Sequence, residues 1–244
     1  MRVDPVNSAI RIEALRKRYG GVLALDAVDL AVAPGEAFGL LGANGAGKTT
    51  LIKCLLDLCA YDSGNVRIFG LAADLPQSRR RLAYVPERFM PPHYLRAREF
   101  IQLLARAFGL RYDPARAQSM LRELELDAEV LERPVRGLSK GMTQKLGLAA
   151  SLLMERELYV LDEPMSGLDP AARVAVKAAL RRLAAEGRTL FFTSHVLADV
   201  EELCTCIAVL EKGSVRWHGP PQALCAKYHE PRLEQAFTRC VREK

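Results

Sequence analysis

The chain has 244 residues, of which 50% are hydrophobic and 26% charged, a composition that excludes a disordered chain and suits one large domain or two small ones. Its longest uncharged stretches hold about ten residues, half of what a membrane-spanning helix needs, so the chain is not expected to cross a bilayer by itself. The net charge of +6 could favour anionic lipid headgroups or nucleic acid, and a solvated basic surface is the preferred interpretation. Because the arginine clusters lack interleaved aromatic residues, no nucleic-acid partner is expected.

The N-terminal third begins without a secretory signal. Residues 1–10 contain charges and a proline where a signal peptide would need an apolar core, so the protein is expected to stay in the cytoplasm. Short extended segments follow at 10–15, 22–32 and 64–69, separated by glycine and proline. These segments predict an antiparallel sheet that flanks the core.

A glycine-rich loop follows the first buried strand, predicted at 37–41. Residues 42–49 fit the pattern G-x-x-x-x-G-K-[ST], in which backbone N–H groups and a helix N-terminus converge on phosphate. Lys48 is expected to reach the β- and γ-phosphates of ATP, and the Thr49 hydroxyl to bind Mg²⁺. A plain glycine turn before a core helix is the alternative. The expected nucleotide-binding residues here are Gly42, Asn44, Gly45, Ala46, Gly47, Lys48, Thr49 and Thr50.

Helical patterns follow this loop and dominate the middle of the chain. The first helix is expected to bury Leu51, Cys54, Leu55 and Leu58, and a second strand is predicted at 82–85. Strand signals then vanish from about 88 to 154. One stripe there consists of Phe100, Leu103, Leu104 and Ala107, and a helix that begins at Asp113 and Pro114 places Ala117, Met120, Leu121 and Leu124 on one side. This region is interpreted as a helical insertion in an α/β core.

Two carboxylates end the next buried strand, predicted at 158–161. Ligands collect at the carboxyl ends of strands in open α/β sheets, which places Asp162 and Glu163 beside the glycine loop. Asp162 can orient the Mg²⁺ shell, and Glu163 can polarise a water molecule against the γ-phosphate. A helix cap or a surface turn is the ordinary alternative for such a pair.

The remaining elements complete an α/β pattern. Asp169 and Pro170 begin a helix with Ala172, Val176, Ala179, Leu180 and Leu183 on one face. Further strands are predicted at 190–193 and 206–210, and the tail from 222 to 244 is expected to be helical. The buried runs indicate a mainly parallel sheet. The six cysteines form no CxxC pair and sit mostly in apolar runs, which favours reduced packing residues over metal ligands or disulfides.

A third motif gives the chain a family resemblance. Residues 138–142, Leu-Ser-Lys-Gly-Met, look like the LSGGQ signature of ABC proteins and precede a helix with Met142, Leu146, Ala149 and Leu153 on one side. Ser139 therefore stands at a positive helix end. In order with the glycine loop and the Asp-Glu strand, this motif makes nearly the whole chain resemble the ATP-binding subunit of ABC transporters.

The resemblance implies a P-loop (RecA-like) core and a site shared between two subunits. In that family the signature, here Ser139 and Gly141, closes over ATP held by the partner's phosphate loop in a head-to-tail dimer. The segment 166–169, which ends at Asp169, matches the segment that passes along the dimer seam. His195 matches the histidine that contacts the γ-phosphate and holds the catalytic glutamate. Tyr19 matches the aromatic residue that stacks on adenine, and a core tyrosine is its alternative.

The resemblance also implies a division of the chain into parts. The ATP-binding core with its antiparallel sheet would span 1–87 and 155–221, the helical signature subdomain 88–154, and the helical tail 222–244. The segment after Glu87, with Phe89, Tyr94 and Leu95, occupies the family's docking surface for the membrane subunit. Packing explains these aromatic residues equally well.

The chain departs from the family pattern at two places. Glu87 stands where many members have glutamine, and its carboxylate can face Mg²⁺ or the attacking water while adding negative charge near the phosphates. Lys140 and Met142 replace a glycine and a glutamine of the signature, and the ammonium of Lys140 could help hold the partner's nucleotide. With residues 233–237, these features look similar to ATPases of the ABC-2 type, which are mostly exporters.

The expected function is ATP hydrolysis that powers substrate movement through separate integral membrane permease subunits, at the inner face of the cell membrane. A second identical chain is the expected partner in the dimer. One alternative is a soluble ABC ATPase that acts on ribosomes or DNA, although the chain has a single cassette and no sustained heptads. An unrelated P-loop kinase or GTPase would leave the signature and His195 unexplained.

Overall fold

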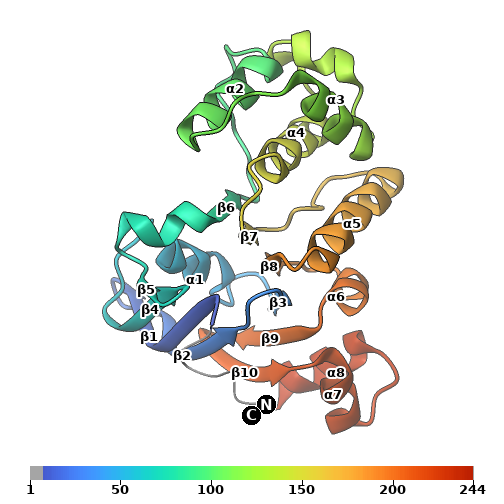
Figure 1. Cartoon of the computed structure of the whole chain (residues 1–244). Coiled ribbons are helices and arrows are strands. Elements are labelled where there is room, and N and C mark those ends of the chain that lie inside the picture. The colour runs from blue at the N-terminus through green and yellow to red at the C-terminus, as the bar shows by residue number, and fades with distance from the viewer. Residues whose placement is uncertain (1–7, 244) are drawn as a thin grey trace.

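A six-stranded sheet forms the centre of the molecule (Figure 1). The structure is a computed structural model that describes residues 8–243. All neighbouring strands of this sheet are parallel except the edge pair β10 and β9, which is antiparallel. In spatial order the strands are β10 (Ser214–Gly219), β9 (Cys206–Glu211), β3 (Ala37–Leu41), β8 (Thr189–Thr193), β7 (Leu158–Leu161) and β6 (Leu82–Val85).

Strands β3, β7 and β8 are buried at every position because both faces of the sheet are covered. Successive side chains of a strand point to opposite faces. In β3, Phe38 and Leu40 pack into one hydrophobic cluster and Ala37 and Leu41 into the other, and all four are buried. Fully burying a large apolar side chain contributes roughly 1.5–3 kcal/mol, so these runs fix the strands in the middle of the fold.

A second, antiparallel sheet packs against one face of the central sheet together with helix α1 (Lys48–Leu55). It contains β2 (Val22–Val32), β1 (Ile10–Tyr19), β4 (Ser63–Ile68) and β5 (Leu71–Ala72), hydrogen-bonded in that order. Its inner face joins Phe38, Leu40 and the buried side of α1 in one cluster. The antiparallel sheet expected from the sequence is thereby confirmed.

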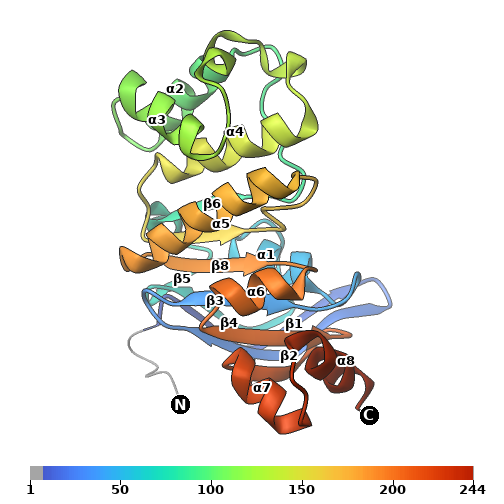
Figure 2. The ribbon, with the colours of Figure 1, turned by 90° about the vertical axis from the view of Figure 1, so that its right-hand side faces the viewer.

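Three helices form a lobe at one end of the molecule, farthest from the antiparallel sheet (Figures 1 and 2). They are α2 (Ala97–Ala107), α3 (Pro114–Glu123) and α4 (Lys140–Leu152). Short 3-10 turns at Pro76–Arg81, Ala128–Glu132 and Val135–Gly137 join the elements around them. Helix α3 begins as predicted, because the Asp113 side chain accepts hydrogen bonds from the N–H groups of Ala115 and Arg116.

The remaining helices cover the other face of the sheet and one edge. They are α5 (Pro170–Ala185), α6 (Leu197–Leu203), α7 (Pro221–Tyr228) and α8 (Leu233–Arg242). All five residues predicted for the apolar face of α5 are buried. Helices α7 and α8 occupy the tail predicted at 222–244, with a break at His229, which has a left-handed backbone, and Lys244 lies outside the described residues. None of the helices within residues 8–243 is both long and apolar enough to span a bilayer.

Two sequence predictions of buried faces are wrong. Leu58 is exposed because α1 ends at Leu55 and the chain turns through Asp57, whose φ of 58° is left-handed. In α2 the stripe lies elsewhere, since Leu103 and Ala107 are exposed. Its buried residues are Ala97, Phe100, Ile101 and Ala105. The α/β fold with a mainly parallel sheet is confirmed, and β10 and β5 are strands that the sequence analysis missed.

Candidate active site

A cleft of about 700 Å³ opens at the carboxyl ends of the central strands. From the loop after β3 and the start of α1, the residues 43–45 and 47–50 line it, whereas the predicted residues Gly42 and Ala46 do not. Asp162 and Glu163 follow β7, and His195 follows β8. Residues from three separate sequence motifs therefore share one wall. Parallel strands bring this about because all their carboxyl ends meet at the same edge of the sheet.

The glycine loop is packed so closely that two of its positions exclude a side chain. A Cβ at Gly42 would lie 2.5 Å from the carbonyl oxygen of Leu210. At Gly47 it would lie 2.8 Å from the carbonyl oxygen of Ala24, and the φ of 112° is left-handed. Gly47 is also the residue that caps α1, so this backbone path delivers the positive end of the helix to the cleft.

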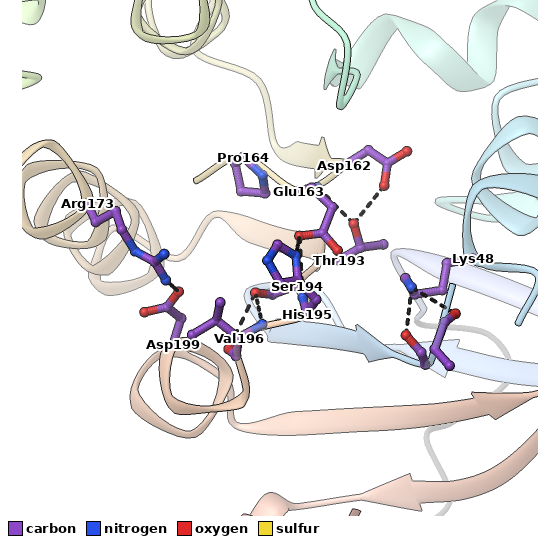
Figure 3. Close-up of polar contacts among 12 residues, drawn as sticks. Lys48, Asp162, Glu163, Pro164, Arg173, Thr193, Ser194, His195, Val196 and Asp199 are labelled. Atoms are coloured by element: carbon purple, nitrogen blue, oxygen red, sulfur yellow. Dashed lines mark hydrogen bonds and ion pairs between the residues drawn. The ribbon is translucent and has the colours of Figure 1, made fainter. Parts of the chain in front are cut away.

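Lys48 is buried at the start of α1, where its ammonium stays inside the loop. Its Nζ donates hydrogen bonds to the carbonyl oxygens of Gly42, at 2.7 Å, and Ala43, at 3.3 Å (Figure 3). An ammonium has three donors. The loop carbonyl oxygens thus hold the Lys48 ammonium in place, and Lys48 lines the cleft.

Asp162 is a buried carboxylate, 2% exposed, with neutral partners. Its Oδ1 accepts a 2.7 Å hydrogen bond from Thr193 Oγ1, and its Oδ2 lies 3.5 Å from Thr49 Oγ1. Burial raises the pKa of Asp162, and the Glu87 and Glu163 carboxylates raise it further, against the opposing effects of Thr193 and Lys48. Such a carboxylate is stabilised by a cation placed next to it.

Glu163 and His195 form a pair that lines the cleft. His195 Nδ1 lies 2.7 Å from Glu163 Oε2, and the His195 backbone N–H donates to the same oxygen at 3.3 Å (Figure 3). The Glu163 side chain is only 11% exposed, whereas that of His195 is 62% exposed. Glu163 has a left-handed φ of 49°, which is uncommon for a residue with a side chain and typical of functional sites.

Oxygen atoms from three residues could hold a divalent cation here. Thr49 and Asp162 are in contact, and Glu87 lines the same cleft. Within residues 8–243 no group of three or more His, Cys, Asp or Glu side chains forms a complete metal site. Two carboxylates and a hydroxyl suit Mg²⁺, which usually takes one or two protein carboxylates and completes its shell with water and phosphate.

The signature residues lie outside this cleft. Ser139 caps α4, its Oγ accepting from the Met142 N–H at 3.2 Å, and neither Ser139 nor Gly141 lines the cleft. Asp169 caps α5, and the hydrogen bond from the Ala172 N–H lowers the pKa of its carboxyl. A Cβ at Gly141 would lie 3.7 Å from the Gly167 carbonyl oxygen. The signature and the segment 166–169 are therefore neighbours of each other.

Tyr19 is not a core residue, because 47% of it is exposed. It ends β1, its hydroxyl lies 3.6 Å from Cys59 Sγ, and the ammonium of Lys17 sits 4.8 Å above its ring. The ring does not line the cleft, although its strand partner Val22 does. Tyr19 therefore lies outside the cleft, paired with a strand residue that lines it.

Part of the cleft wall was missed by the sequence analysis. Residues 22–24 of β2 form an apolar side, and Lys212 and Gly213 add to the lining. Ser166, from the segment 166–169 that the sequence assigned to the dimer seam, also lines the cleft. Gly213 in the turn between β9 and β10 donates its N–H to the Ala46 carbonyl oxygen at 2.9 Å. A Lys-Gly pair between two strands is a turn signal, but only the fold brings that turn to the glycine loop.

The proposed docking segment is partly packed and partly exposed. Phe89 meets Phe100 edge to face at 5.6 Å, and a Cβ at Gly147 in α4 would lie 2.7 Å from the Phe89 ring. Tyr94 and Met90, by contrast, are among the most exposed apolar residues of the chain. Packing thus accounts for Phe89 but leaves Tyr94 unexplained.

Comparison with known proteins gives a consistent set of relatives. The family model for ABC transporters matches residues 25–166. The Nod factor export ATP-binding protein I of Paraburkholderia xenovorans is 36% identical over 90% of this chain and 73% of its own length. The chain spans 57% of the length of another curated relative.

Two solved structures support the same conclusion. An ATP-binding subunit of an ABC transporter superimposes with a TM-score of 0.89 at 31% identity, covering 96% of this chain and 99% of the other. A dimeric bacterial ABC transporter cassette, MJ0796, gives a TM-score of 0.78 at 25% identity, covering 86% of this chain and 98% of its own. The chain belongs to the ABC transporter family of ATP-binding ATPases.

Proposed function

We propose that this chain is the ATP-hydrolysing subunit of a transporter and that two copies close head to tail over two ATP molecules. The observation that best supports this proposal is that the cleft unites the glycine loop with Glu163 and His195, whereas Ser139 and Gly141 lie outside it. The cleft thus contains the phosphate loop and the proposed general base but not the signature residues. In the ABC family, such a cleft is half of an ATP site. The dimeric relative supports a second subunit as the other half.

The residues of the cleft have separable roles in this proposal. The backbone of residues 42–49 and Lys48 bind the phosphates, with the ammonium exchanging its contacts to the Gly42 and Ala43 carbonyl oxygens for phosphate oxygens. Glu163 accepts the proton of the attacking water, and His195 holds its carboxylate in place. Tyr19 stacks on adenine at the mouth. From the partner, Ser139, Gly141 and Asp169 approach the γ-phosphate.

The residues that would hold Mg²⁺ are Thr49, Asp162 and Glu87. Of the three, Asp162 is the best-supported Mg²⁺ ligand, because burial disfavours its charged form unless a cation lies next to it. When bound there, Mg²⁺ would neutralise charge that develops on the phosphates during phosphoryl transfer. Thr193 keeps Asp162 in position through its 2.7 Å hydrogen bond.

The transport partners follow from the family. We infer separate integral membrane permease subunits at the inner face of the cell membrane, contacted by the helical part of the chain at 88–154 and its exposed Tyr94. The core at 1–87 and 155–221 would hold ATP, and 222–244 would form the tail. Outward transport of the ABC-2 type is supported by the export function that the Paraburkholderia relative's name states.

Glu163→Gln tests the proposed chemistry. Without the carboxylate, turnover should fall at least about a hundredfold, the usual contribution of a general base. Binding of ATP should survive, and the variant should accumulate as a dimer with ATP in size-exclusion chromatography. The exposed Glu129→Gln is the matched control and should keep wild-type turnover. Undiminished turnover of Glu163→Gln would exclude Glu163 as the base.

The partner is tested by recovery from detergent-solubilised membranes. A tagged chain should bring down a multi-spanning membrane protein in a defined ratio. Recovery of ribosomal particles or DNA without any integral membrane protein would instead support an ABC ATPase that acts on those assemblies.

A further inference from the structure

A partly buried ion pair joins α5 to α6 (Figure 3). The carboxylate of Asp199, in the first turn of α6, is 6% exposed and pairs with the guanidinium of Arg173 on α5. Lys177 Nζ lies 3.7 Å from the other oxygen of Asp199. A buried charge is costly unless it is paired, so the position of Asp199 is tied to that of α5.

Asp199 is connected to His195 through a short turn of backbone. The Asp199 N–H donates to the Val196 carbonyl oxygen at 3.1 Å, and the Val196 N–H donates to Ser194 Oγ at 3.0 Å. His195 lies between Ser194 and Val196, inside this turn (Figure 3). Any shift of Asp199 therefore moves the backbone that aims the imidazole.

The imidazole of His195 holds the carboxylate of Glu163 through a hydrogen bond. In the part of the chain that the structure describes, both hydrogen bonds to the Glu163 carboxylate come from His195, one from the ring and one from the backbone. Glu163 has a left-handed φ, which must be maintained by its surroundings. The aim of His195 consequently decides where the carboxylate of Glu163 points.

At its other end, the ion pair is connected to the segment 166–169 through the backbone of Arg173. Its backbone N–H donates to the Asp169 carbonyl oxygen at 3.0 Å, and Asp169 caps α5 at the end of the segment 166–169. Arg173 therefore belongs to the first turn after this segment, which lies next to Gly141 of the signature. A rigid helical turn separates the ion pair from the region proposed to meet the partner subunit.

We propose that Arg173 and Asp199 are positioning residues for ATP hydrolysis: their ion pair sets His195 against Glu163 and ties that setting to the segment 166–169. This inference rests on the proposed function. Neither residue lines the cleft or touches the reacting atoms. Movement of the segment 166–169 on dimer closure is transmitted to the base through Arg173, Asp199 and the turn at 194–196.

A purely structural role is the competing explanation, and the molecule contains a control for it. One turn farther along, Lys177 and Arg181 of α5 pair with Glu202 of α6. Arg181 is exposed and does not contact Asp199. Arg181→Ala therefore loosens the same two helices without disturbing the route to His195.

The experiment is a double-mutant cycle with Arg173→Met and Asp199→Asn, which remove the charges and keep most of the volume. Each variant should lower kcat about tenfold to a hundredfold, the effect of a small misplacement of a catalytic group. Affinity for ATP, measured in Glu163→Gln backgrounds that cannot hydrolyse it, should stay within about twofold. The double variant should be no slower than the slower single variant, and Arg181→Ala should keep wild-type kcat.

Two results of the cycle would overturn the proposal, and a third variant supplies a further test. One is a lower melting temperature with unchanged kcat per folded molecule, which would make the pair structural. The other is multiplication of the two single effects on kcat in the double variant, which would show independent actions. If Asp199→Asn fails to fold, Arg173→Lys replaces it: the retained charge should restore most of the kcat lost in Arg173→Met, and no restoration contradicts the proposal.

The measurement also separates this inference from the proposed function. Wild type and Glu163→Gln are measured in parallel. If wild type hydrolyses ATP and Glu163→Gln does not, while the cycle shows no effect on kcat, only the positioning role fails. If Glu163→Gln turns over like wild type, the proposed base fails whatever the cycle shows.

Discussion

The cleft differs from the signature end, the region around Ser139, Gly141 and Asp169, in how many of its functional side chains already have polar partners. In the cleft, Lys48, Asp162 and Glu163 each have defined polar partners, and buried strands hold them from behind. At the signature end, Ser139 and Asp169 only cap their own helices. Helix capping is an ordinary structural task. From this difference we infer that the cleft would bind ATP in a single chain, whereas Ser139 and Asp169 would act only against a second surface.

The largest expected effect lies in the cleft. Lys48→Ala removes the ammonium held beside the glycine loop and should weaken ATP binding about 10- to 100-fold, since hydrogen bonds to charged groups contribute about 1.5–3 kcal/mol. Fluorescent-nucleotide titration of the monomer measures this. Lys53→Ala, an exposed residue of the same helix, is the matched control. Equal affinities of wild type and Lys48→Ala would show that the cleft is not the phosphate site.

A smaller effect concerns the stability of the fold, where loss of the Asp162 charge should be a gain and not a loss. Burial raises the pKa of Asp162, so the folded chain holds this proton more tightly than the unfolded chain does. Stability from this group is present below its ordinary pKa and is lost as pH rises through the raised value. At pH 7, without nucleotide or Mg²⁺, Asp162→Asn should therefore raise the melting temperature by a few degrees, since 1 kcal/mol shifts a chain of this size by roughly 2–4 °C.

The same substitution should abolish turnover, which would separate stability from function at one position. Thermal melts at pH 7 and pH 4 provide the check, because the gain should shrink at the lower pH. The exposed Asp74→Asn should change neither value. A lower melting temperature for Asp162→Asn at pH 7 would mean that Thr193 and Lys48 outweigh the cost of burial.

The sequence predicted the fold best where one local signal was sufficient. Continuous apolar runs located β3, β6 and β7 with their observed bounds. The edge strand β10 was missed because Arg216 and His218 interrupt it and because its pairing with β9 is a long-range contact. The buried face of α2 was misplaced because its neighbours, α4 and the turn at Ala128–Glu132, decide which side is covered.

The same distinction holds for the site. Fixed-spacing motifs indicated residues 42–49, Asp162 and Glu163, and the fold brings Asp162, Glu163 and all of the loop except Gly42 and Ala46 together in one cleft. The apolar wall at 22–24 and the turn at Lys212 and Gly213 could not be predicted, since their place depends on how β2 and the β9–β10 turn pack on the loop. The roles proposed for Ser139 and Asp169 need a second chain, so one sequence supplies only the resemblance for them.

The central claim, that the cleft is half of a shared site, is tested most directly by mixing two inactive variants. Lys48→Ala lacks a working phosphate loop, and Ser139→Arg lacks a working signature. In a head-to-tail dimer of one chain of each, the intact loop of one faces the intact signature of the other. Neither variant should turn over alone, and the mixture should recover up to about a quarter of wild-type turnover, because half of randomly assorted dimers are mixed and each has one intact site. A mixture as inactive as its components, with mixed dimers demonstrated by two different tags, would contradict the shared site.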